Sequence, residues 1–332
     1  MNKYFFDQIL RSAFAIIAGV LLFLALWGVR LFGVYGEPVT EATVTFFGCS
    51  FHPQLPLQVA ISALLILVDV YLIYHLSSEY ILFDTRTHFA PSQFLAIVGG
   101  AAFFMPLQNS NIVLPLALTA IFILLSTYQQ RQATSEYVSA FTLLGIVTIL
   151  SPKWMLLLPF IFLGCGVCQS LAPRNFAAGL IGFIAPYWIS AGVLYLCGHI
   201  ADFVLPFQEL IRFSAIDYAT LTVEQVTAGA VVLFMAVPAL FLYPNTSFTL
   251  KEKARVAYLF LITLFASALL LVLLQPTLFA ELIPLLAVLA CIFVTRMLLA
   301  SNERFGSTYL LLLILIYLLY ITVPLWKDSL IF

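Results

Sequence analysis

The sequence predicts an all-α membrane protein, a polytopic bundle of about eleven transmembrane helices. Its composition is the first reason: 63% of the 332 residues are hydrophobic and only 9% are charged, whereas a soluble globular chain carries about 25% charged residues. Thirty-one Phe and fifteen Tyr add apolar bulk that suits a bilayer. The apolar runs are also continuous rather than alternating, which favours helices over the strands of a membrane barrel.

Eleven apolar runs of spanning or near-spanning length follow one another, where a span needs about 20 apolar residues. They cover residues 12–29, 57–77, 93–107, 112–128, 135–150, 153–170, 176–197, 226–243, 255–274, 276–296 and 306–325. The runs at 93–107 and 135–150 are short, so each is either re-entrant or completed by polar flanks. Without an internal repeat or a soluble stretch, residues 1–332 are expected to form a single integral membrane domain.

Basic residues predict the orientation of these spans. With the N-terminus in the cytoplasm and eleven alternating crossings, ten Lys and Arg lie on the cytoplasmic side and four outside, as the positive-inside rule requires. The cluster KEKAR belongs to a cytoplasmic loop near 244–255, and the C-terminus is outside. The net charge of −1 provides no basic face for nucleic acid.

Two loops are then expected on the outer face, near 30–56 and 198–225. The first contains GEPVTEA, in which Glu37 and Glu41 stand four residues apart; they are either a catalytic pair at the membrane surface or solvated loop charges. The second, ADFVLPFQELIRFSAIDY, places charges at helical spacing. It is either an amphipathic surface helix, a lid or a partly buried connector.

Charged residues inside spans are costly and are candidates for function. Asp69 lies well inside the second span, in LLILVDVYLIYHL, and could carry a proton in a transporter or make a structural hydrogen bond. No intramembrane Lys or Arg partner is visible, which favours the structural interpretation. Glu281, in QPTLFAELIPLL, is expected about 9 Å below the outer end of its span. It could complete an acidic site with Glu37 and Glu41.

No cofactor is evident. The five cysteines are dispersed, and the one CxxC pair, Cys165 and Cys168, has no second ligand pair. The four histidines fall in separate segments. The stretch GLIGFIAPYWISAG at 179–192 combines small residues with Tyr187 and Trp188. Small residues suit close helix packing, although the aromatic rings could also stack on a sugar or a polyprenyl chain.

Four motifs follow one another in the central part of the chain. They are YILFDTRTHFAPSQFLAI (80–97), the turn QNSN (108–111), EYVSAFTLLGIVTILSPKWMLLLPFIFLG (136–164) and RNFAAGLIGFIAPYWI (174–189). In this order they resemble an uncharacterised polytopic inner-membrane protein family of Bacteroidetes, over about residues 70–200. The resemblance implies a multi-pass protein of the bacterial inner membrane.

The architecture also resembles the GT-C glycosyltransferases, which have many spans and an acidic site in the first outer loop. This resemblance implies sugar transfer from a polyprenyl-phosphate carrier at the outer face, often with a divalent metal. Glu37 or Glu41 would be the base, and Arg30 or Arg212 would hold phosphate. The first outer loop differs from the family's pattern because it is short and contains no Asp.

Three functions therefore remain open. The favoured one is a non-catalytic component of envelope assembly or maintenance, in contact with membrane lipids or other envelope proteins. The second is a GT-C-like transferase, and the third is a transporter or flippase for a lipid or small solute. Whether the chain is an enzyme stays open.

Overall fold

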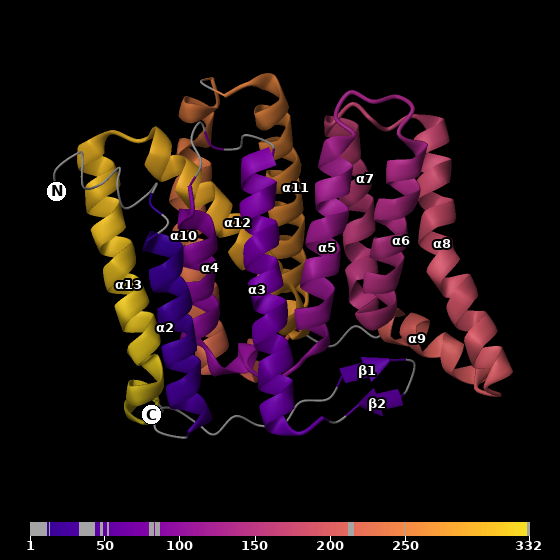
Figure 1. The fold of residues 1–332 in the computed structure, drawn as a ribbon, viewed down its shortest axis with the longest axis horizontal. Helices are drawn as coiled ribbons and strands as arrows, with labels where there is room; N and C mark the ends of the chain where they lie inside the picture. Colours follow the sequence, from indigo (N-terminus) through magenta and orange to yellow (C-terminus); the bar gives the residue numbers. More distant parts are fainter. Residues whose placement is uncertain are drawn as a thin grey trace.

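The computed structural model describes residues 12, 14–32, 44–46, 49–51, 53–79, 83, 87–211, 216–248 and 250–330. Glu37, Glu41 and Arg212 lie outside the described residues. The helices stand side by side and are joined at two opposite ends (Figure 1). We call these the upper end, where α10 connects to α11, and the lower end, where the two short strands lie.

Within the described residues, eight helices are long and apolar enough to cross a membrane, which confirms the prediction of a helical membrane protein. They are α2 (Phe14–Leu31), α3 (Leu55–Glu79), α5 (Asn109–Ser126), α8 (Pro173–Leu196), α10 (Val223–Ser247), α11 (Glu252–Leu274), α12 (Phe279–Ala300) and α13 (Glu303–Leu330). Three further apolar helices are shorter: α4 (Phe89–Gly100), α6 (Thr134–Leu150), and α7 (Leu158–Val167) with the preceding 3₁₀ segment η2 (Pro152–Leu157). The short runs near 93–107 and 135–150 thus correspond to α4 and α6.

The lower end contains the short elements. An antiparallel hairpin joins β1 (Val44–Phe46) to β2 (Cys49–Phe51), with Thr45 opposite Ser50. This hairpin lies within the segment 30–56 that the sequence predicts as a loop, and the all-α prediction does not include it; β-branched and aromatic residues such as Val44, Thr45 and Phe46 favour an extended backbone. Three 3₁₀ segments, η1 (Ala102–Phe104), η4 (Tyr218–Thr220) and η5 (Pro276–Leu278), also lie between helices.

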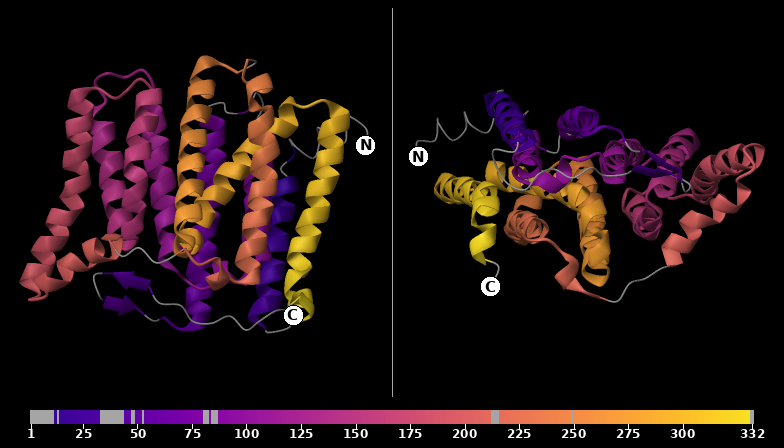
Figure 2. Two further views of the ribbon diagram at one scale, coloured as in Figure 1. Left: turned by 180° about the vertical axis from the view of Figure 1, so that it is seen from behind. Right: turned by 90° about the horizontal axis from the view of Figure 1, so that it is seen from below.

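In its described residues, the loop predicted near 198–225 is divided into short pieces rather than forming one amphipathic helix. Gly198, with φ of +78°, follows the end of α8 in the left-handed conformation that glycine favours. The 3₁₀ segment η3 (Ile200–Val204), the seven-residue helix α9 (Leu205–Ile211) and then η4 follow. Figure 2 shows from behind that η3 and α9 lie along the lower edge beyond the end of α8. The loop acts as a connector between two parts of the bundle.

The core of the bundle is built around α12. The span Pro276–Ala300 includes this helix, and 94% of its most apolar eighteen-residue stretch is buried; α12 packs against α10, α4, α11 and α5. The outer helices instead expose large apolar side chains, for example Leu64 at 62%, Trp188 at 75% and Phe241 at 81%. Such broad apolar exposure suits hydrocarbon rather than water.

Close packing of α6 against α8 explains the small residues of the GLIGFIAPYWISAG stretch. A Cβ added to Gly182 would overlap the backbone carbonyl of Val138, and one added to Gly145 would lie 2.7 Å from the carbonyl oxygen of Phe183. Small residues let membrane helices approach in this way. Tyr187 is buried and donates a hydrogen bond to the Thr148 hydroxyl at 3.0 Å.

Candidate functional site

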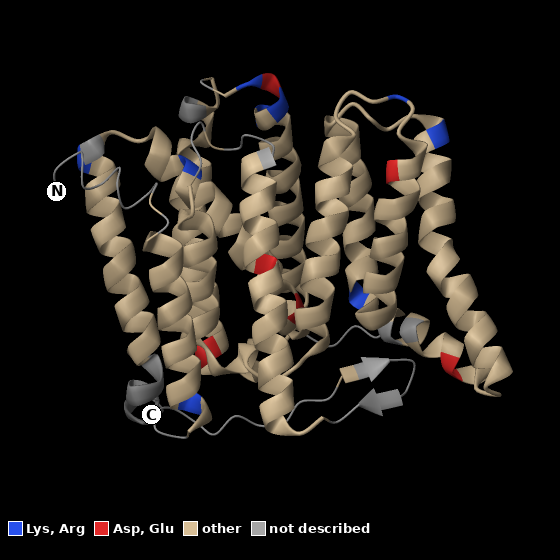
Figure 3. Cartoon of the chain, in the orientation of Figure 1, with Lys and Arg blue, Asp and Glu red and all other residues tan. Residues whose placement is uncertain are grey.

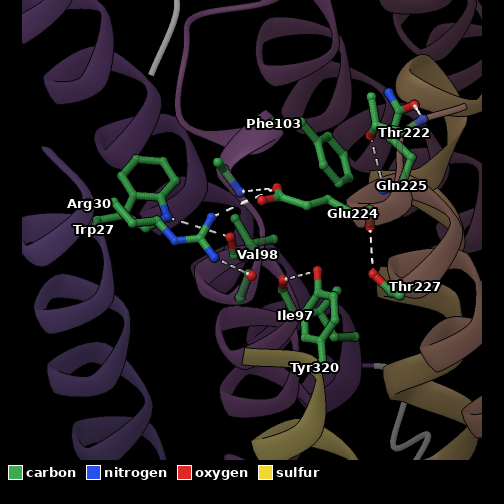
Figure 4. Close-up of polar contacts among 12 residues, drawn as sticks. Trp27, Arg30, Ile97, Val98, Phe103, Thr222, Glu224, Gln225, Thr227 and Tyr320 are labelled. Carbon is green, nitrogen blue, oxygen red and sulfur yellow. Dashed lines mark hydrogen bonds and ion pairs between the residues drawn. The ribbon is translucent and has the colours of Figure 1, made fainter. Parts of the chain in front are cut away.

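The lower end of α4 is a buried helix terminus, and side chains from other helices donate to three of its last four carbonyl groups. A helix leaves its last four carbonyls without intrahelical partners. Tyr320 of α13 donates to the carbonyl of Ile97 at 3.1 Å, and the Trp27 indole of α2 donates to that of Val98 at 3.5 Å. The Arg30 guanidinium donates to that of Gly100 at 2.6 Å. Figure 4 shows these three donors converging on α4.

An ion pair completes this arrangement. Arg30 is only 1% exposed, and its Nη1 lies 3.9 Å from Oε2 of Glu224, which is 15% exposed. The same carboxylate oxygen accepts the backbone N–H of Ala102 at 2.9 Å (Figure 4). Arg30 therefore binds the last carbonyl of α4, at Gly100, and Glu224 binds the N–H of Ala102, two residues further along the chain. We call the set Trp27, Arg30, Glu224 and Tyr320 the α4 clamp.

Local sequence explains where the members of the α4 clamp lie. Glu224 is in the first turn of α10, where a carboxylate is favourable near the helix N-terminus. Thr222 and Gln225 form a reciprocal capping box that starts this helix. Gly100 permits the clamp, because a Cβ at this position would overlap the ring of Tyr320. Arg30, a predicted phosphate ligand, thus contacts protein groups in this structure.

Asp69, the predicted intramembrane carboxylate, lies midway along α3 and is 1% exposed. Asp69 is near the middle of Leu55–Glu79, whereas most of the charged residues drawn in Figure 3 gather near the two ends of the bundle. Its Oδ1 has no hydrogen-bond partner among the described residues. Two other buried polar residues, Gln58 and Ser62, lie nearer the lower end of α3, and the Ser62 hydroxyl accepts a hydrogen bond from Asn111 of α5 at 2.9 Å.

Of the other predicted acidic site residues, only Glu281 lies in the part of the chain that the structure describes, and it is not at the level of Asp69. Glu281 is half-buried in the first turn of α12, at the lower end, whereas Asp69 is midway along α3. The roles proposed for Glu37, Glu41 and Arg212 stay predictions, because these residues lie outside the described parts. Among the described residues, no group of three or more His, Cys, Asp or Glu side chains could hold a metal ion. Cys165 and Cys168 are buried free thiols.

An apolar cavity of about 360 Å³ lies between α10, α11 and α12 near the lower end. Val226 and Gly229 line it from α10, Leu269 from α11, and Phe279 and Ile283 from α12. Tyr218 of η4 lies at its lower end, where its hydroxyl donates to the carbonyl of Leu273 at 2.6 Å. The cavity can hold a hydrocarbon group but presents no charged side chain among these lining residues.

Sequence reasoning missed both Glu224 as a partner of Arg30 and the apolar cavity. Glu224 carries a local signal, since the sequence Thr-Val-Glu-Gln at 222–225 matches the start of a helix. Nothing local connects it with Arg30, which lies 194 positions earlier. The cavity has no comparable motif, because its lining residues resemble those of any apolar span.

Comparison with known proteins adds a family but no activity. No curated protein matches the sequence. A family model described as a family of unknown function (DUF6427) matches residues 39–327, which include α3 to α12, Asp69, Glu224 and all the lining residues of the cavity. The match extends over most of the chain, and the protein therefore belongs to this family of unknown function.

Proposed function

We propose that this protein is a multi-pass component of the bacterial inner membrane that binds the hydrocarbon chain of a membrane lipid, in the service of envelope assembly or maintenance. The apolar cavity between α10, α11 and α12 carries the proposal. Its volume of about 360 Å³ falls in the range of about 300–1,000 Å³ that is usual for ligand pockets.

The apolar lining of the cavity favours an apolar ligand. An apolar cavity of about 150 Å³ stays free of water and binds small apolar molecules, and the present cavity is larger at about 360 Å³. Val226 and Leu233, which line it from α10, are 52% and 38% exposed. Their exposure places the mouth on the side of the bundle, where the bilayer supplies acyl or prenyl chains. A lipid chain therefore fits better than a polar solute.

The distribution of charge supports the orientation that the sequence predicts. Among basic side chains that the structure describes, seven lie in or near upper-end connections and two, Arg30 and Lys153, near the lower end. The seven are Arg131, Arg174, Lys251, Lys253, Arg255, Arg296 and Arg304. Under the positive-inside rule the upper end faces the cytoplasm. The eight long and three shorter helices then make eleven passes, and the cavity lies in the outer half of the membrane.

Photo-crosslinking tests this function. The full chain is reconstituted in lipid nanodiscs with a phospholipid that carries a diazirine in its acyl chain, and labelled peptides are mapped by mass spectrometry. Labels are expected to concentrate on the cavity-lining parts of α10, α11 and α12. The substitution Ala230→Trp, at a lining position, should reduce this labelling several-fold.

A matched control lies on the same helix. Val237 is 60% exposed and is not among the cavity-lining residues, so Val237→Trp should leave cavity labelling unchanged. Equal reductions by both substitutions, or labels spread evenly over the lipid-facing surface, would refute a specific chain-binding site.

The transferase alternative has its own test, which does not depend on the cavity. If either glutamate is a catalytic base, replacing Glu37 and Glu41 together by Gln should abolish an envelope glycan while the protein remains at normal abundance. The lipid-binding function predicts unchanged glycans and unchanged crosslinking in the same variant.

A further inference from the structure

Asp69 occupies an unusual place for a carboxyl group. Its side chain is 1% exposed, it lies within a candidate membrane span of 24 residues, and its Oδ1 has no hydrogen-bond partner among the described residues. An ionised carboxylate buried without a partner is very costly, and such a group becomes neutral instead. Asp69 is therefore expected to be neutral unless a charged group faces it.

Two contacts between α3 and α5 define the surroundings of Asp69. Ser62 bonds to Asn111, and further along both helices the ring of His75 lies 4.8 Å from that of Phe122. The two helices therefore run in the same direction, and Asp69 lies between these two levels. The segment of α5 between Asn111 and Phe122 is IVLPLALTAI. Its only polar side chain, Thr119, donates to the carbonyl of Pro115 in its own helix at 2.8 Å.

No charged group faces Asp69 from the helices that pack most closely on α3. Neither α4 nor α5 contains Asp, Glu, Lys, Arg, His or Tyr within its helical bounds. On α3 itself, Tyr71 is 62% exposed, Tyr74 stacks on His88 at 4.7 Å, and His75 contacts Phe122. The charged residues of α12, Glu281 and Arg296, lie toward its two ends. A neutral carboxylic acid suits these surroundings.

A row of polar groups extends from the lower end of α3 toward the level of Asp69. Asp69, Ser62 and Gln58 share one face of α3, since they are seven and four residues apart. The amide of Asn111 contacts the Ser62 hydroxyl, and the Gln58 amide donates to the carbonyl of Pro53 at 2.8 Å. Pro115 has no N–H to donate to the carbonyl of Asn111, so the helix of α5 supplies no bond to this acceptor. Asp69 and Ser62 are about two helical turns apart, and the residue between them on this face is the apolar Ile66.

We propose that Asp69 is a proton-binding site in the interior of the membrane domain, and that Ser62 and Asn111 lie on the route by which its proton exchanges with the lower end. Exchange requires α3 and α5 to separate enough to hydrate the level of Ile66. This site is distinct from the cavity between α10, α11 and α12, so it stands whether or not the cavity binds a lipid.

Infrared spectroscopy of the full chain in lipid nanodiscs tests the protonation state. A protonated carboxyl group gives a C=O stretching band, and Asp69→Asn should remove one such band while leaving the amide bands unchanged. Persistence of the full band intensity in Asp69→Asn would overturn the proposal. If this variant does not fold, the wild-type protein is treated with dicyclohexylcarbodiimide, an apolar reagent for protonated carboxyl groups. Failure to modify Asp69, as mapped by mass spectrometry, would also overturn it.

The exchange route is tested by transfer into D₂O, which shifts the band as the proton is replaced. Ser62→Ala and Asn111→Leu are each expected to slow this shift several-fold. Ser77→Ala is the matched control, because Ser77 is also buried on α3 but donates to the carbonyl of Ile73 in its own helix at 2.7 Å. An unchanged rate in both route variants, or equal slowing in the control, would refute the route.

Discussion

Replacing Arg30 by methionine is expected to lower the free energy of unfolding by about 3–5 kcal/mol, the usual cost of breaking a buried ion pair from one side. The guanidinium Nη1 lies 3.9 Å from Glu224 Oε2, and two unit charges at this separation attract by about 4 kcal/mol at an effective dielectric constant of about 20. The bond to the Gly100 carbonyl adds about 1.5–3 kcal/mol, as for other charged donors. The substitution also removes the cost of burying the charge of Arg30, and this gain offsets part of the two losses.

A double-mutant cycle with Glu224→Gln separates the pair from its surroundings. Unfolding is followed by far-UV circular dichroism in mixed micelles as the fraction of denaturing detergent rises. The coupling energy between Arg30→Met and Glu224→Gln is expected to be about 1–3 kcal/mol. Lys153→Met is the control, since the contact of Lys153 with another side chain among the described residues is a 3.4 Å hydrogen bond to the Thr277 hydroxyl; it should cost less than about 1 kcal/mol. Additivity of the two clamp substitutions within about 0.5 kcal/mol would refute the pairing.

Two further predictions concern packing, and the same unfolding measurement checks both. Tyr320→Phe should lower stability by about 1–3 kcal/mol because it leaves a buried carbonyl of α4 without its donor, whereas Tyr71→Phe, at a position 62% exposed, should have no measurable effect. Gly182→Ala should cost about 1–3 kcal/mol because its Cβ would overlap the Val138 carbonyl. Gly192→Ala on the same helix meets no atom within 4 Å and should not destabilise; equal losses from the two glycine substitutions would contradict the α6–α8 contact.

Most of the helical framework follows from hydropathy, because each span must be apolar along its own length. The runs predicted at 12–29 and 255–274 correspond to α2, Phe14–Leu31, and α11, Glu252–Leu274. The run at 93–107 was harder to interpret, because apolar residues continue past the point where the helix ends. Gly99 and Gly100 mark that end, yet only the contact with Tyr320 shows why glycine is needed at position 100.

Among the candidate sites, too, some features can be predicted from the sequence and others require the fold. Asp69 could be identified from sequence, since a single carboxylate in an apolar run stands out whatever surrounds it. The pairing of Arg30 with Glu224 could not, because it depends on α2, α4 and α10 meeting in space. The apolar cavity depends on the volumes of side chains from three helices, and hydropathy reports the polarity of a residue but not the space left beside it.

The α4 clamp and Asp69 show two different uses of polarity within one apolar bundle. In the clamp, each buried carbonyl or charge has a donor or counter-charge from another helix, so the groups stabilise one arrangement of α2, α4, α10 and α13. At Asp69, the facing segments of α4 and α5 supply no charged partner, so the carboxyl group adds no comparable restraint between helices. Stability alone does not account for a carboxyl group at this position, where an apolar residue of similar size would pack at lower cost. Its chemistry, the gain and loss of a proton, is therefore the property to be tested first.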